Sequence, residues 1–124
     1  MVISTKTHGV LDYASAGALV ALPRLLGLNR QATTLLTGAG LGTLVYSLLT
    51  DYELGAVRAL PMQAHLALDA GSGAMLALAS LLLPGQSTGV RSLLLGLGAF
   101  ELFASASTET APHSGRPAFE AIAG

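Results

Sequence analysis

The chain has 124 residues, of which 52% are hydrophobic and only 10% are charged, and its mean hydropathy is +0.62. Ordinary globular domains carry roughly 25% charged residues, so this chain has too few charges to cover a soluble helical core. A net charge of −1, without a run of Lys or Arg, argues against nucleic acid as a partner, and the absence of cysteine excludes disulfides, thiolate metal ligands and thiol catalysis.

Four apolar stretches follow one another along the chain, at residues 8–28, 34–50, 64–83 and 91–107. Each is near the lower length limit for a helix that crosses a hydrocarbon core of about 30 Å. Short segments that contain Gly, Pro and most of the charges separate them. We therefore predict an all-α, multi-pass membrane protein with four transmembrane helices within residues 1–110, followed by a flexible tail at 111–124. Its first partner is the lipid bilayer.

The first pair of stretches resembles the second. The shift that places His8 on His65 also places Asp12 on Asp69 and Ser15 on Ser72, without a gap. The total number of identities is close to what composition alone gives, but these rarer residue types coincide in one register. We interpret the chain as two tandem parallel-repeat helical hairpins, at about 3–56 and 60–110. Such repeats place the two histidines at one depth, on one side of the membrane.

The doubled motif is the strongest candidate for a site. His and Asp at i and i+4 share one helix face, and if the two faces meet, two imidazoles and two carboxylates converge. This set suits a divalent metal ion in a chain without thiolates, and two facing histidines are alternatively axial ligands of a haem iron. The structural alternative is that each Asp accepts a hydrogen bond from its own His or caps a helix N-terminus. The candidate metal ligands are His8, Asp12, His65 and Asp69.

Glu101 is the most isolated carboxylate, in the middle of an apolar stretch. An ionised acid facing lipid costs at least about 2.5–3.5 kcal/mol, so we expect Glu101 to be buried in the bundle, as are Ser15 and Ser72. It either carries protons, contacts a cofactor or is held by hydrogen bonds.

Small residues predict close helix packing. Gly38 and Gly42 form a Gly-x-x-x-Gly pair, and Gly73 has the same spacing to Ala77. In membranes such patterns let helix backbones approach each other. They serve packing within the chain or between copies of it.

A family resemblance rests on these motifs. His-x-x-Leu-Asp, a small-residue helix and the segment ALPRLLG at residues 21–27 resemble the SPW-repeat family of small bacterial membrane proteins. The segment TDYELGAVRALPMQAHLALD is similar to the stretch that joins the two repeats in that family. The resemblance covers most of residues 3–107, although Arg24 stands where the family has Trp and the second corner reads Ala-Ser-Leu. It implies a four-helix protein of the bacterial inner membrane and no defined activity.

Three functions are compatible with this pattern. The chain has no Gly-x-Ser-x-Gly elbow, phosphate loop or His-Glu-x-x-His motif, so we do not expect an enzyme. The first function is a structural or accessory subunit that packs in a larger membrane complex or against copies of itself. The second is a metal- or haem-binding membrane protein that uses the paired His and Asp. The third is a small transporter or proton-conducting bundle built on Glu101 and the aspartates.

Overall fold

The computed structural model describes residues 2–110, so the predicted tail lies outside the described residues. The described part is all-helical, as predicted. Its helices begin a few residues before the apolar stretches, because polar side chains that precede three of them accept hydrogen bonds from backbone N–H groups. The four helices are α1 (Thr5–Leu25), α2 (Arg30–Leu48), α3 (Met62–Leu82) and α4 (Thr88–Ser107).

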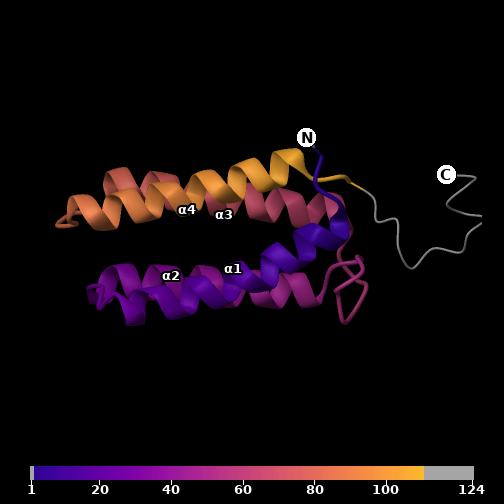
Figure 1. Ribbon diagram of the computed structural model, residues 1–124, viewed down its shortest axis with the longest axis horizontal. Coiled ribbons are helices and arrows are strands. Elements are labelled where there is room, and N and C mark those ends of the chain that lie inside the picture. The colour runs from indigo at the N-terminus through magenta and orange to yellow at the C-terminus, as the bar shows by residue number, and fades with distance from the viewer. Residues whose placement is uncertain (1, 111–124) are drawn as a thin grey trace, which may run out of the picture.

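The helices form two hairpins, α1 with α2 and α3 with α4, that lie alongside each other (Figure 1). The two hairpin loops lie at one end, which we call the loop end. The connector between the hairpins, residues 49–61, lies at the opposite end, together with the start of α1 and the end of α4. We call this the connector end. Both histidine motifs therefore start at the same end of the bundle.

Hydrogen bonds join the two hairpins at each end. At the loop end the Asn29 side chain donates to Gln86 Oε1 at 2.7 Å. At the connector end the Ile3 N–H donates to the Ser107 carbonyl at 2.6 Å. These contacts link segments that are far apart in the sequence, so the hairpins are held in one register along the bundle.

Leucine side chains fill the bundle between the hairpins. One from each helix is no more than 2% exposed, and together they form one apolar cluster. These four leucines are almost fully buried and contact one another, so the layer that they form is the main apolar core of the described residues. Its central members are Leu19, Leu36, Leu76 and Leu94.

Glycines allow the helices within each hairpin to approach closely. A Cβ atom built on Gly73 would lie 2.8 Å from the Gly98 carbonyl oxygen, and one on Gly40 would lie 2.9 Å from the Ala16 carbonyl oxygen. Gly73 is therefore a packing glycine, as expected. We expected Gly38 and Gly42 to serve packing within the chain or between copies of it. The first use is wrong, because both glycines are exposed and no atom lies near the position that a Cβ would take. The face of α2 toward α1 carries Gly40 instead.

Buried positions recur between the hairpins at two different shifts. Each buried residue of α1 has a buried counterpart in α3, and their residue numbers differ by the same amount as those of His8 and His65. Between α2 and α4 the residue numbers of most buried counterparts differ by one more. An alignment of the two hairpins without a gap therefore pairs residues of α2 with residues of α4 that are one position too early. Gly27 and Gly85, the loop glycines with positive φ, also differ by the larger number. The second hairpin therefore has one residue more than the first, and that residue lies before Gly85. The paired buried positions include Leu19 and Leu76 in the first set, and Leu36 and Leu94 or Gly40 and Gly98 in the second.

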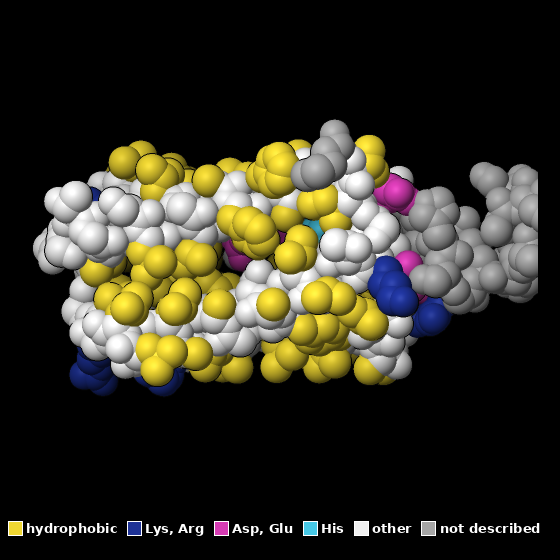
Figure 2. Space-filling model, in the orientation of Figure 1, with side chains coloured by type: hydrophobic (Ala, Val, Ile, Leu, Met, Phe, Trp, Pro, Cys, Tyr) yellow, Lys and Arg dark blue, Asp and Glu magenta, His cyan; other side chains and the backbone are white. Residues whose placement is uncertain are grey.

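Two of the helices, α3 and α4, are long and apolar enough to cross a membrane. The helices α1 and α2 contain more charged and polar side chains, so their mean hydropathy is lower than that of α3 and α4. Hydrophobic side chains cover much of the face in Figure 2, and Lys and Arg lie at the two ends of the bundle. Lys and Arg are thus absent from the middle of this face, and an acidic side chain lies there in a hollow between the hairpins.

Candidate functional site

The two His-Asp motifs meet at the connector end, between α1 and α3. Each motif lies within the first turns of its helix, and its side chains point across the bundle. One ligand atom from each residue lies within 4.8 Å of the other three, and all four residues are no more than 5% exposed. The structure therefore brings together the four residues His8, Asp12, His65 and Asp69, which we call the His/Asp cluster.

Each imidazole contacts the carboxylates of both hairpins. The Nε2 atom of His8 forms a hydrogen bond of 2.6 Å with Asp69 Oδ2 and lies 3.1 Å from Asp12 Oδ1. The Nε2 atom of His65 lies 2.9 Å from Asp12 and 3.1 Å from Asp69, but neither contact has hydrogen-bond direction. The interactions are shared across the bundle, so the alternative in which each Asp is satisfied by its own His does not describe the site.

The other ring nitrogen of each histidine is held by a threonine. His8 Nδ1 lies 2.7 Å from Thr108 Oγ1, and His65 Nδ1 lies 2.7 Å from Thr50 Oγ1. Each threonine hydroxyl donates its only hydrogen to a backbone carbonyl of the helix that precedes it, at 2.5 Å. The hydroxyl oxygen must therefore accept a hydrogen bond from Nδ1–H. This places a proton on Nδ1 of each ring and turns Nε2 toward the carboxylates. Because Nε2 of His8 also donates to the Asp69 carboxylate, His8 carries a proton on both nitrogens.

Two tyrosine hydroxyls bind the carboxylates from outside the cluster. Tyr46 on α2 donates to Asp69 Oδ1, and Tyr52 in the connector donates to Asp12 Oδ2 at 2.8 Å. Tyr52 is fully buried, and burial together with the negative charge of Asp12 raises the pKa of its phenol. The phenol thus stays a hydrogen-bond donor at neutral pH.

Sequence reasoning missed these four supporting residues. Thr50 and Thr108 follow the larger shift of the second half, so they do not coincide in the register that superposes the histidines. An alignment with one additional residue in the second loop would have paired them. Tyr46 and Tyr52 have no repeated counterpart, since residue 104 is Ala and the connector occurs once. No periodic signal marks them.

The cluster offers two imidazole nitrogens and two carboxylates, a set of atoms that could hold a metal ion. With Nδ1 bonded to a threonine, Nε2 is the atom of each ring that faces the carboxylates. In the metal-free site Nε2–H of His8 donates to Asp69, and a divalent ion would displace that proton and be balanced by the two carboxylates. Zinc bonds of about 2.0–2.2 Å place tetrahedral ligand atoms roughly 3.3–3.5 Å apart, so the contacts of 2.6–3.1 Å would widen by about half an ångström. Hydrogen bonds from threonines and tyrosines orient the ligands, as outer-shell partners do in metal sites.

The haem alternative does not fit this geometry. The two imidazole rings lie edge to face, with centroids 5.4 Å apart. A porphyrin would have to pass between them, where the carboxylates of Asp12 and Asp69 contact both Nε2 atoms. The cluster therefore suits a bare ion and excludes a macrocycle.

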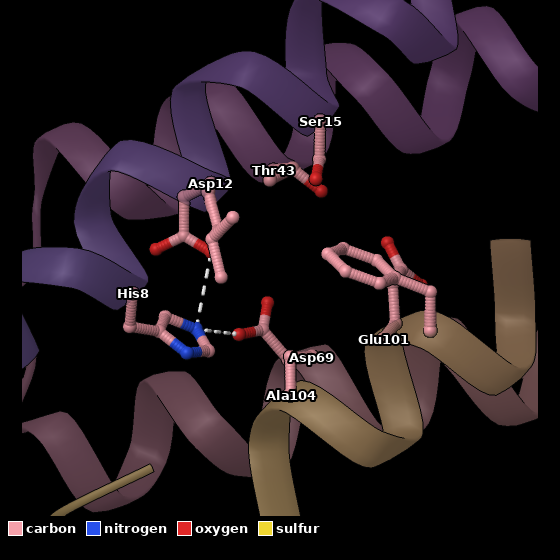
Figure 3. A pocket seen from close by; sticks show the side chains of 9 residues that line it. His8, Asp12, Ser15, Thr43, Asp69, Glu101 and Ala104 are labelled. Atoms are coloured by element: carbon pink, nitrogen blue, oxygen red, sulfur yellow. Dashed lines mark hydrogen bonds and ion pairs between the residues drawn. The ribbon is translucent and has the colours of Figure 1, made fainter. Parts of the chain in front are cut away.

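Glu101 lies beside the cluster, on α4. Its side chain is buried and its Oε2 atom has no hydrogen-bond partner. It lines a cavity of about 10 Å³ together with His8, Asp12 and Asp69 (Figure 3). Glu101 is thus buried as expected.

Ser15 and Ser72 are half-buried as whole residues, and the hydroxyl oxygen of Ser72 is itself buried. Each lies about one turn beyond the Asp of its motif, on the flank of the buried helix face, where the two hairpins separate. Ser15 lines the same cavity as Glu101. The Ser72 hydroxyl interacts with the Glu101 carboxyl, but its oxygen is enclosed without a partner in hydrogen-bond geometry. The cluster therefore has polar neighbours on its inner side.

Comparisons with models of protein families, with curated proteins and with solved structures find no match. The resemblance to SPW-repeat proteins, which rests on short motifs, stays a prediction. The function of the chain is accordingly argued from the geometry of the site.

Proposed function

We propose that the chain is a membrane protein that binds one divalent transition-metal ion in the His/Asp cluster. The observation that carries the proposal is the convergence of four buried ligand atoms, two nitrogen and two oxygen, within 4.8 Å. Buried charges in proteins are paired or coordinate metals. In this cluster the imidazoles and carboxylates form a buried ion-pair network, and a divalent ion would bind between them in place of the protons on Nε2.

The supporting residues favour an ion over a simple ion-pair network. Both Nδ1 atoms donate to threonine hydroxyls whose own hydrogens are taken by backbone carbonyls. This arrangement fixes the orientation of both rings, with Nε2 toward the carboxylates, before an ion arrives. Imidazole and carboxylate ligands suit zinc, iron or manganese in the divalent state, whereas a site without thiolates does not favour copper(I).

The membrane location belongs to the same proposal. The apolar helices α3 and α4 support it, and so do the many exposed leucines of α1 and α2, such as Leu25 at 79% exposed and Leu41 at 52%. We propose that all four helices span the bilayer as two copies of one hairpin. The resemblance to SPW-repeat proteins then points to the bacterial inner membrane.

Metal titration of the purified protein in detergent micelles tests the proposal. We expect one ion per chain after loading with zinc or manganese and removal of free metal, measured by elemental analysis. The double variant Asp12→Asn with Asp69→Asn keeps the shape of the side chains but removes both charges, and should bind no stoichiometric metal. The matched control Asp51→Asn changes an exposed Asp in the connector and should bind as the wild type does. Absence of stoichiometric metal from the loaded wild type would contradict the proposal.

A second function, packing as an accessory subunit, is favoured by the outer face of α2. Gly38 and Gly42 lie there with no contact inside the chain, next to the exposed Leu41 and Val45. Small residues on an outward helix face permit close contact with another membrane helix. Replacing both glycines with Leu should leave the monomer folded and disperse any oligomer, as measured by light scattering in micelles. An unchanged oligomer, or a wild type that is only monomeric and copurifies with nothing, would remove this function.

A further inference from the structure

The surroundings of the His/Asp cluster differ on its two sides, although the hairpins match elsewhere. The shift that relates the buried positions of α2 to those of α4 pairs Tyr46 with Ala104 and Thr43 with Glu101. On the α2 side the Tyr46 ring fills the space and its hydroxyl binds Asp69. On the α4 side a methyl group takes the place of that ring, so the cluster is closed on one side only.

The cavity beside the cluster lies on this α4 side. Its volume is about 10 Å³, close to the roughly 10–15 Å³ that one water molecule requires. Polar atoms surround it, including the ligand carboxylate of Asp69 and the side chains of Ser15, Thr43 and Glu101 (Figure 3). A buried water needs two to four such partners. The cavity therefore has the size and the polarity for one water-sized molecule in contact with the cluster.

Glu101 supplies the independent sign that a ligand belongs here. The residue is only 8% exposed. The Ser72 hydroxyl interacts with its carboxyl, but neither Glu101 Oε2 nor the Ser72 hydroxyl oxygen has a partner in hydrogen-bond geometry among the described residues. Buried oxygens of this kind are nearly always paired, because leaving one unpaired costs free energy. A hydrogen-bond donor in the cavity would be its partner.

A second, larger cavity adjoins the same residues. It measures about 110 Å³, is mostly apolar, and is lined by Leu19, Leu97 and Phe100 together with Ser15 and Glu101. It lies between α1 and α4, where Figure 2 shows a hollow with an acidic side chain at its floor. Small neutral molecules thus have an approach from the side of the bundle that ends at Glu101.

We propose that the metal ion keeps one open coordination position on the Ala104 side, which holds a water or a similarly small neutral molecule that donates a hydrogen bond to Glu101. This inference rests on the proposed metal function and deepens it. Structural metal sites are closed by protein ligands, whereas reactive sites keep a position for an exchangeable ligand. Four protein ligands would close a tetrahedral site, whereas an ion that takes six ligands, such as manganese, would keep a position for an exchangeable ligand beside Ala104.

Electron–nuclear double resonance of the manganese-loaded protein in ¹⁷O-enriched water tests the open position. We expect one coupled water oxygen per manganese in the wild type. Ala104→Leu fills the cavity and should abolish the water signal with one manganese still bound. The matched control Ala106→Leu alters an exposed alanine of the same helix and should retain the signal.

A pair of variants tests Glu101 at nearly constant size. Glu101→Gln keeps a hydrogen-bonding side chain and should retain the coupled water, whereas Glu101→Leu should lose it. A wild type that binds manganese without a coupled water, or a signal that persists in Ala104→Leu or Glu101→Leu, would overturn this inference alone. A wild type that binds no manganese or zinc would instead overturn the proposed function.

Discussion

The two ends of the bundle are built in different ways. At the connector end a polar cluster joins the hairpins, made of two histidines, two aspartates and their threonine and tyrosine partners. Toward the loop end the buried contacts are apolar, with one leucine from each helix, and exposed Asn and Gln side chains join the hairpin loops. Among the described residues, only the connector end carries a buried cluster of His and Asp that could hold a metal ion.

This difference separates what holds the fold from what performs the function. Leucine burial stabilises the bundle without direction, in proportion to the apolar area removed from contact with solvent or lipid. Hydrogen bonds in the polar cluster depend on direction, so each of them fixes the orientation of an imidazole ring or a carboxylate. Changes at one end should therefore alter metal affinity, and changes at the other should alter the free energy of unfolding.

The largest effect is expected from removal of a metal ligand. His8→Ala and His65→Ala should each weaken metal binding by more than the roughly 10–100-fold that an outer-shell change produces, because a donor atom is lost. Competition with a chelator in micelles measures the affinity. The control Gln63→Ala changes an exposed side chain two residues before His65 and should bind normally. If one histidine variant kept full affinity, the ion would not bind between the hairpins.

At the loop end, Leu36→Ala and Leu94→Ala should each lower the free energy of unfolding by about 2–5 kcal/mol, because each leaves a cavity in the leucine layer. Reversible unfolding in mixed micelles, followed by circular dichroism, measures this loss. Metal affinity of the folded protein should stay unchanged. A loss of affinity as large as the histidine variants show would mean that the two ends are coupled, and the division between them would fail.

The threonines should give an intermediate effect at the connector end. Thr50→Val and Thr108→Val keep the side-chain shape but remove the acceptor for Nδ1–H, so metal affinity should fall by about 10–100-fold. Thr34→Val, on an exposed position of α2, is the matched control. Equal effects of the two variants would indicate that both histidines are held alike. An unchanged affinity in both would remove the threonines from the site.

Sequence reasoning reached the fold and the core of the site, because these depend on patterns along the chain. Apolar stretches between turn formers indicated four helices, and the doubled His-x-x-Leu-Asp motif indicated which faces meet. The partners Thr50 and Tyr52 were missed, since their roles depend on how the connector folds over the cluster. Gly38 and Gly42 were misplaced because a spacing of four does not say which side of α2 faces its neighbour. Without the additional loop residue of the second hairpin, the sequence does not pair Ala104 with Tyr46, so the difference between the two sides of the cluster could not be predicted.

The most direct test of the central claim is the X-ray absorption fine structure of the zinc-loaded protein. A site shared by both hairpins predicts scattering from two imidazole rings, together with carboxylate oxygens, at about 2.0–2.2 Å from the ion. In His8→Ala loaded with excess zinc, any remaining site signal should show one imidazole. Two imidazoles in the wild type would support an ion held between α1 and α3. A zinc spectrum with one imidazole or none would contradict it.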